Sequence, residues 1–190
     1  MTVLPVIAAG LTASATRVAA QEAASPPGKR SDQTATSKTL VAFFSRTGNT
    51  RVIAGQIRRA RDAALFEIKA AKPYPEDYEE TVAQAARETS AGYLPPLGHF
   101  VADLRQYDTL YLGFPIWGMT APPVIRSFLR GHDLSGKHVL PFITHGGYGL
   151  GDSMEVIRAL APAARVADPF SMEADQEKRT LQQVSGWLSA

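Results

Sequence analysis

Short apolar runs and helical periodicity alternate along the chain from Lys38 onward. The first run, residues 39–45 with the sequence TLVAFFS, is continuous and short, as expected for a strand buried on both faces of a sheet. The next stretch, Thr50 to Arg61, places Val52, Ile53, Ile57 and Ala60 on one side, which predicts an amphipathic helix. The same alternation continues to the end of the chain.

The alternation predicts an α/β protein. Strands are expected at residues 39–45, 64–70, 108–115, 136–147 and 164–172, and helices at 50–61, 77–90, 122–129, 152–160 and 173–188. Strands that alternate with helices form βαβ units with right-handed crossovers, and these units build a parallel sheet. In such sheets, ligands bind beyond the carboxyl ends of the strands. The loops after the first, third and fourth predicted strands are therefore the candidate site.

The N-terminal segment, residues 1–37, has a different composition. Residues 3–15 are apolar and small, a stretch about as long as a signal-peptide core and too short to cross a bilayer. Small residues up to Ala20 provide a cleavage site, and residues 21–37 are rich in Ala, Ser, Thr and Pro, which is typical of a flexible linker. We expect an export signal and linker at 1–37, a periplasmic or otherwise exported protein, and one domain at 38–190. No Lys or Arg precedes the apolar run, so either the signal is atypical or the true start lies upstream of Met1. The alternative to a signal is a disordered N-terminal extension on a cytoplasmic protein.

Composition and charge exclude several classes of site. The 190 residues suffice for one domain with a full core, and 45% hydrophobic content is ordinary for a soluble globular protein. Lys and Arg number 20 against 18 Asp and Glu, and they are interspersed, which does not indicate a nucleic-acid surface. The absence of cysteine excludes disulfides, thiolate metal sites and cysteine nucleophiles. His99, His132 and His138 are too scattered to suggest a metal site.

The first loop, SRTGNT at residues 45–50, joins a strand to a helix through small polar residues. Backbone N–H groups at the positive end of a helix favour an anion, and Gly48 supplies a close approach or a positive φ. The loop has neither a P-loop lysine nor the Gly-x-Gly-x-x-Gly pattern, so it suits one phosphate monoester held by neutral donors. The alternative is an ordinary helix cap by Asn49 or Thr50.

The second and third loops carry features that suit a planar ligand. PIWGMTAPP at 115–123 places Trp117 just past a strand end, where its ring can cover a planar group. The alternative is a Trp that packs beneath the loop. THGGYGLGD at 144–152 contains four glycines, whose uncovered backbone can donate to the edge of a heterocycle, and Tyr148 is a second stacking candidate. The alternative is a loop that is merely flexible.

Together, SRTGNT, GFPIWG and PFITHGGYG resemble the three FMN-binding loops of the flavodoxin family. The first loop matches the family pattern Ser/Thr-x-Thr-Gly-x-Thr. YPEDYEETVAQAARE and SGKHVLPFITHGG further resemble a bacterial flavodoxin-like subgroup, and the uninterrupted ARVADPFSM resembles the short-chain type. The resemblance covers Thr39 to Leu188. It implies a three-layer, doubly wound, five-stranded parallel sheet of order 2-1-3-4-5 that binds FMN non-covalently.

The resemblance also implies roles for individual residues. The first loop would hold the phosphate, Trp117 would stack on the isoalloxazine, and the Gly118 peptide would turn toward flavin N5. The third loop would donate to the pyrimidine edge, with Tyr148 on the outer face. The implied cofactor-binding residues are Ser45, Arg46, Thr47, Gly48, Asn49 and Thr50, then Pro115, Ile116, Trp117, Gly118 and Met119, then Thr144, His145, Gly146, Gly147, Tyr148 and Gly149.

Three functions are compatible with these loops. The first is a flavodoxin-like protein that transfers electrons between redox partner proteins. The second is an FMN-dependent NAD(P)H:acceptor oxidoreductase that reduces a quinone-type small molecule, although no nicotinamide fingerprint is present. The third is a flavin-binding module without turnover. His145 lies in the third loop, and because the ordinary pKa of histidine is about 6.5, we hypothesise that it raises the potential of the reduced flavin below about pH 6.5. The alternative is a histidine that caps the loop or faces solvent.

Overall fold

A computed structural model of the chain describes residues 37–173 and 177–189. The predicted export signal and linker lie outside the described residues, except for Ser37. Within the described part of the chain, no helix is both long enough and apolar enough to cross a membrane.

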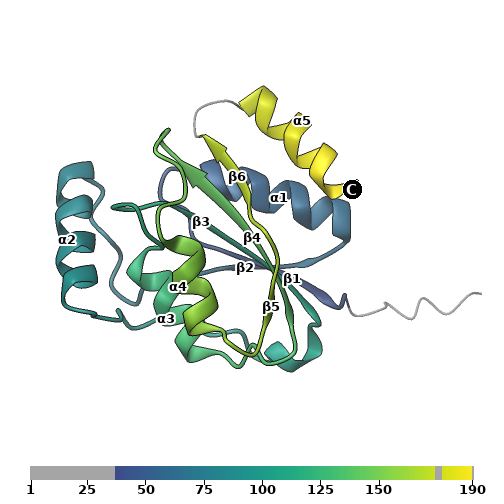
Figure 1. Cartoon of the computed structure of the whole chain (residues 1–190), viewed down its shortest axis with the longest axis horizontal. Coiled ribbons are helices and arrows are strands. Elements are labelled where there is room, and N and C mark those ends of the chain that lie inside the picture. The colour runs from purple at the N-terminus through teal and green to yellow at the C-terminus, as the bar shows by residue number, and fades with distance from the viewer. Residues whose placement is uncertain (1–36, 174–176, 190) are drawn as a thin grey trace, which may run out of the picture. The chain divides into compact units, whose positions relative to one another are not determined.

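Strands and α-helices alternate along the described residues (Figure 1). The elements are β1 (Thr39–Phe43), α1 (Asn49–Arg61), β2 (Ala64–Glu67), α2 (Tyr78–Ser90), β3 (Thr109–Pro115), α3 (Pro123–Gly131), β4 (His138–His145), α4 (Ser153–Leu160), β5 (Arg165–Val166), β6 (Phe170–Glu173) and α5 (Glu177–Leu188), with a short 3₁₀ turn at Leu104–Gln106. All strand pairs are parallel, in the order β2-β1-β3-β4-β5, and β6 also pairs with β4. The predicted α/β class and strand order are confirmed.

The predicted single strand at 164–172 is wrong in detail, because it divides into β5 and β6. Arg165 pairs with His138, an offset of 165 − 138 = 27, whereas Phe170 pairs with Phe142, an offset of 170 − 142 = 28. The edge strand therefore contains one extra residue, as in a β-bulge. Pro169 lies in this break, and its lack of an N–H prevents a regular ladder there.

Helices cover both faces of the sheet, as predicted for a three-layer protein (Figure 1). Alternate residues of β1 enter different cores: Leu40 and Ala42 pack with residues of α3 and α4, whereas Val41 and Phe43 pack with residues of α1 and α5. This period of two is expected for a strand buried on both faces. The sheet therefore holds β1, β3 and β4 at its centre, with their ends fixed from both sides.

The buried face of α1 is rotated from the predicted one. The buried residues are Thr50, Ile53, Ala54 and Ile57, whose spacing of three and four forms one helical stripe. Val52 is 38% exposed and Ala60 is exposed, so their assignment to the buried side is wrong. Thr50 turns inward in their place, although its hydroxyl gave no apolar signal in the sequence.

Gly113 in β3 lies directly against the aromatic ring of its neighbour in β4. The two residues pair in the parallel register, and a Cβ at Gly113 would lie 2.0 Å from the ring of Phe142. Phe142 is fully buried. The glycine is required here by space, since a glycine inside a strand often marks such a close approach.

Candidate functional site

The three predicted loops share one edge of the sheet, since β1, β3 and β4 are parallel neighbours (Figure 1). Direct hydrogen bonds connect them. The hydroxyls of Thr50 and Thr144 lie 2.9 Å apart in a buried contact, and the Ile116 N–H donates to the Thr144 carbonyl at 2.8 Å. The Asp152 N–H donates to the Met119 carbonyl at 3.1 Å. Residues far apart in the sequence thus form one continuous surface.

The first loop leaves the start of α1 without a side-chain cap of the usual kind. Gly48 occupies the cap position with φ of +100°, in the left-handed region. The hydroxyl of Ser45 accepts from the Gly48 N–H at 3.1 Å and from the Arg51 N–H at 3.4 Å. Asn49 is already helical and Thr50 is bonded to Thr144, so the alternative that either residue caps the helix is wrong. No acidic residue lies in the first turn of α1.

The remaining side chains of the first loop are accessible. Arg46 and Thr47 are exposed, and Asn49 is partly exposed. The Arg46 guanidinium donates to the Glu76 carbonyl at 3.3 Å, which connects the loop to the segment before α2. The loop therefore presents polar groups at the surface while Thr50 anchors it below.

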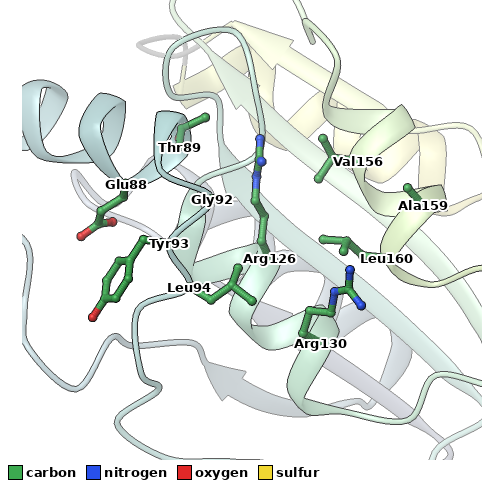
Figure 2. A pocket seen from close by; sticks show the side chains of 10 residues that line it. All are labelled: Glu88, Thr89, Gly92, Tyr93, Leu94, Arg126, Arg130, Val156, Ala159 and Leu160. Carbon is green, nitrogen blue, oxygen red and sulfur yellow. The ribbon is translucent and has the colours of Figure 1, made fainter.

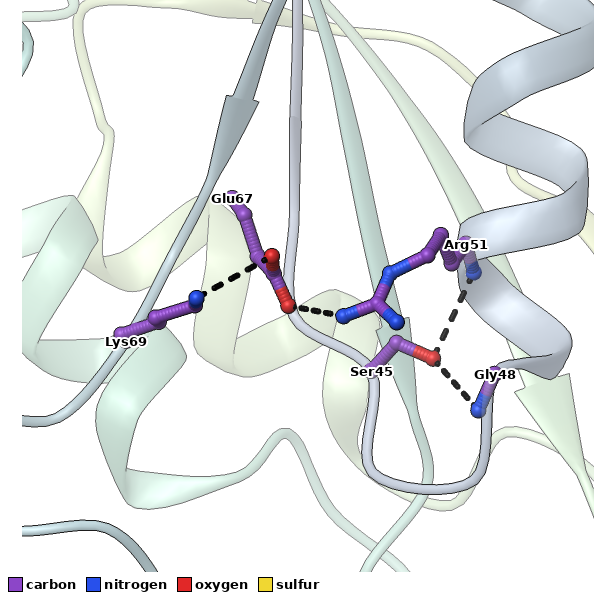
Figure 3. A network of polar contacts seen from close by, with 5 residues as sticks. All are labelled: Ser45, Gly48, Arg51, Glu67 and Lys69. Atoms are coloured by element: carbon purple, nitrogen blue, oxygen red, sulfur yellow. Dashed lines mark hydrogen bonds and ion pairs between the residues drawn. The ribbon is translucent and has the colours of Figure 1, made fainter.

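Arg51 lies beside this loop and was not identified from the sequence. It stands in the first turn of α1, and its guanidinium forms an ion pair with Glu67 at the end of β2. Lys69 contacts the other oxygen of the same carboxylate at 3.4 Å (Figure 3). A cation in the first turn opposes the helix dipole, and this was the available signal.

The second loop contains a tight two-residue turn. Trp117 and Thr120 exchange backbone hydrogen bonds of 3.1 and 3.2 Å across it. Gly118 has φ of +56° and Met119 has φ of +63°, the combination that defines a type I′ turn. The left-handed conformation costs an L-residue such as Met119 about 1–2 kcal/mol.

Trp117 belongs to a cluster of aromatic rings. Its ring packs edge-on against Phe44 at 5.1 Å and against Tyr74 at 4.9 Å between centroids. Trp117 is only partly buried. The packing supports the alternative in which this ring rests on neighbours beneath the loop, while its partial exposure leaves it accessible to a ligand.

Tyr74 is a second residue that sequence analysis missed, since it lies in a proline-rich connector without periodicity. Its hydroxyl donates to Glu88 in α2 at 2.8 Å. Burial, and then the hydrogen bond to Glu88, raise the pKa of Tyr74 well above its usual range. The phenol therefore stays protonated and holds one side of the aromatic cluster in place.

The third loop is built around its glycines. Gly147 and Gly149 have φ of +100° and +79°. The Gly147 N–H donates to Nδ1 of His145 at 3.1 Å, so this histidine caps its own loop, in agreement with the alternative stated for it. Tyr148 is 83% exposed, and among the described residues no aromatic ring packs on it. The third loop thus presents the side chain of Tyr148 to solvent.

Among the cavities of the described residues, one lies at the carboxyl edge of the sheet and a second lies among the helices. One of about 580 Å³ opens beside the first loop, between Ser45, Glu67, Lys69 and Tyr74. The other, about 310 Å³, lies between the end of α2 and helices α3 and α4, and includes none of the predicted loop residues (Figure 2). No group of three or more His, Asp or Glu suited to a metal is present in residues 37–173 and 177–189.

Comparison with known proteins identifies the family. The chain is 30% identical to a candidate flavoprotein from Bacteroides uniformis, with a TM-score of 0.68 over 77% of this chain and 97% of that one. A candidate flavoprotein from Bacteroides eggerthii is also 30% identical, with a TM-score of 0.68 over 80% of this chain and 95% of that one.

A more distant structure shares the fold. A Lactobacillus acidophilus flavoprotein in complex with FMN is 21% identical, with a TM-score of 0.64 over 77% of this chain and 99% of that one. No curated protein sequence matches significantly. The sequence profile of the flavodoxin family matches residues 38–189. The chain therefore belongs to the flavodoxin family.

Proposed function

We propose that the protein binds FMN non-covalently and transfers electrons between redox partner proteins. The observation that carries this proposal is the convergence of a helix start with glycine at its cap position, an accessible Trp117 and a glycine-rich loop at one edge of the sheet. Membership of the flavodoxin family and the FMN-bound Lactobacillus acidophilus relative support it. When bound, the flavin supplies the redox chemistry, and the protein orients it and adjusts its potential.

The first loop fits a phosphate monoester. The first turn of α1 contains no Asp or Glu, and Gly48 leaves open space where a side chain would otherwise stand. The hydroxyls of Ser45 and Thr47 add donors to those of the backbone. Thr50 would act indirectly, since its hydroxyl bonds to Thr144 and fixes the loop against β4.

The second and third loops fit the flavin ring. Trp117 would cover one face, and the backbone of residues 144–149 would donate to the pyrimidine edge. Rotation of the peptide between Gly118 and Met119 converts a type I′ turn into type II′, in which only Gly118 keeps a positive φ. Because this rotation relieves the left-handed Met119, it supports the predicted reorientation of the Gly118 peptide.

The test is the absorption spectrum of the purified protein, followed by anaerobic stepwise reduction. We expect a yellow protein that binds added FMN and accumulates a one-electron-reduced flavin. A colourless protein that does not bind added FMN would contradict the proposal.

The second candidate is an FMN-dependent NAD(P)H:acceptor oxidoreductase, and the cavity beside the first loop favours it. The loop at 91–100 is bonded to the segment that runs along this cavity: the Gly98 N–H donates to the Lys69 carbonyl at 2.8 Å, and the Ala71 N–H donates to the Pro96 carbonyl at 2.7 Å. A small acceptor would find about 580 Å³ there, within the usual range for ligand sites. Rapid bleaching by NAD(P)H alone would select this candidate over the electron carrier.

We further propose that the protein is exported, on the composition of residues 1–37. Mass spectrometry of the protein recovered from each cell fraction tests this, and cleavage after Ala20 is expected. A full-length N-terminus in the cytoplasmic fraction alone would contradict export.

A further inference from the structure

One carboxylate beside the first loop is shared between two cations. Glu67 is paired through Oε1 with Arg51 and through Oε2 with Lys69 at 3.4 Å (Figure 3). The side chains of Arg51 and Lys69 are 56% and 59% exposed, whereas that of Glu67 is 27% exposed. The three residues together carry a net positive charge, because two cations share one anion.

Arg51 contributes both main chain and side chain to this end of α1. Its backbone N–H donates to the Ser45 hydroxyl at 3.4 Å, beside the N–H of Gly48 at 3.1 Å. Figure 3 shows the guanidinium between Glu67 and Ser45. A permanent charge therefore stands next to the group of donors proposed to receive a phosphate.

The pairing of Arg51 with Glu67 is easy to exchange. An exposed ion pair contributes about 0–1 kcal/mol. A guanidinium forms stronger, charge-assisted and often bidentate hydrogen bonds with a phosphate. If Arg51 turns away, Lys69 still compensates the half-buried Glu67, so no carboxylate is left unpaired.

We propose that Arg51 determines specificity for a phosphate monoester. It leaves Glu67 for the phosphate of the bound flavin nucleotide, and Lys69 then holds Glu67 alone. This inference rests on the proposed function but changes its phosphate site, which neutral donors alone were expected to form. Glu67 is a positioning residue that acts through Arg51 and opposes phosphate binding.

The experiment is titration of the apoprotein with FMN and with riboflavin, followed by flavin fluorescence at low and moderate salt. We expect Arg51→Gln to weaken FMN binding about tenfold, which equals about 1.4 kcal/mol, and to leave riboflavin binding within about twofold. The salt dependence of FMN binding should also decrease, because one charged contact is lost. Arg58 is an exposed arginine on the same helix, so Arg58→Gln is the matched control and should change the affinity for neither FMN nor riboflavin.

Glu67→Gln should change FMN affinity in the opposite direction. It frees Arg51 and removes a negative charge, so FMN binding should tighten several-fold with riboflavin unchanged. A misfolded variant cannot produce such a gain. The gain should fall by more than half in the Arg51→Gln background, because Glu67 acts through Arg51.

Four results would overturn the inference. Equal weakening of FMN and riboflavin by Arg51→Gln would assign this arginine a structural role. No change in either affinity would remove Arg51 from the site. A wild-type protein that binds FMN no more tightly than riboflavin would overturn the inference and leave flavin binding intact, whereas one that binds neither would overturn the proposed function as well.

Discussion

Helices α1 and α2 have the same length of 13 residues, yet they begin in opposite ways. The start of α2 is closed by its own chain: the Asp77 carboxylate accepts from the Glu80 N–H at 2.9 Å, and Glu79 and Glu80 add negative charge to the first turn. The start of α1 has Gly48 at the cap position, no acidic residue in its first turn, and Arg51 in their place.

The start of α2 is stabilised by its own residues, whereas the start of α1 is available to a ligand. Both helices carry a partial positive charge at the N-terminus, and negative groups stabilise it. In α2 that stabilisation is internal and permanent. In α1 it is left to the Ser45 hydroxyl and, under the proposed function, to an external phosphate. Substitutions at the start of α1 and at the start of α2 test this difference separately.

The largest effect is expected when the first turn of α1 receives an acidic residue, as the first turn of α2 has. Asn49→Asp places a carboxylate in the first turn of α1, where it would repel a phosphate, so FMN affinity should fall at least about 100-fold. The unfolding free energy of the apoprotein should rise by about 0.3–1 kcal/mol, because the carboxylate favours the helix end. Fluorescence titration and urea unfolding measure the two quantities. Asn49→Ser is the neutral control, and an equal loss of affinity in it would contradict the electrostatic explanation.

The next effect concerns the buried anchor of α1. Thr50→Val or Thr144→Val removes one hydroxyl of the 2.9 Å pair and leaves the other buried without its partner. Each single variant should lose about 1–3 kcal/mol of unfolding free energy. The double variant should lose less than the sum, because no unpaired hydroxyl remains. Strictly additive losses in urea unfolding would show that the two hydroxyls do not interact.

The complementary variant removes the internal cap of α2. Asp77→Ala should lower the unfolding free energy by about 1 kcal/mol, because the Glu80 N–H loses its acceptor. FMN affinity should stay within about twofold, since this helix start takes no part in the proposed site. Asp77→Ser restores a capping oxygen and should recover most of the stability. A large loss of FMN affinity in Asp77→Ala would end the distinction between the two helix starts.

The smallest effect is expected at a helix end closed by a histidine. His132, just after α3, lies with Nδ1 at 2.8 Å from the Phe128 carbonyl, and its Nε2 accepts from the Val101 N–H at 3.2 Å. This pattern requires a neutral ring with the proton on Nδ1. Burial lowers the pKa of His132, and the bond to Phe128 partly offsets the shift.

The sign of the resulting pH dependence follows from the lowered pKa of His132. Above about pH 6.5 the ring is neutral in both states. As pH falls below that value, the unfolded chain takes up a proton before the folded protein does, so the unfolding free energy decreases until the folded pKa is passed. The urea midpoint should drop less between pH 7.5 and 5.5 in His132→Gln than in wild type. An equal drop in wild type and in His132→Gln would contradict this explanation.

Sequence periodicity was sufficient for the succession of strands and helices along the chain, and the acidic residues at 76 and 77 indicated the start of α2. The carboxylate of Asp77 acts within its own turn, so its role is readable from four consecutive residues. The break between β5 and β6 was not predictable, because it depends on how the edge strand meets β4. The burial of Thr50 was not predicted for a related reason: its hydrogen-bond partner Thr144 is 94 residues away in the sequence.

The candidate site shows the same limit. The three loops were recognisable because glycine, tryptophan and small polar residues follow strand ends directly. Glu67 and Tyr74 gave no comparable signal, and Arg51 gave only that of a cation in the first turn of a helix, since each acquires its role from a neighbour on another element. Charge pairing and ring packing across elements are products of the fold, and periodicity does not report them.

The contact between Gly113 and Phe142 also constrains how this family can vary in sequence. Because the Phe142 ring occupies the space that a Cβ at position 113 would need, the two positions share a single volume. A homologue with alanine or a larger residue at 113 should therefore carry a smaller residue at 142. Gly113→Ala should therefore cost less stability beside Phe142→Leu than it does alone. The two strands would thus evolve as a coupled pair, independently of any cofactor.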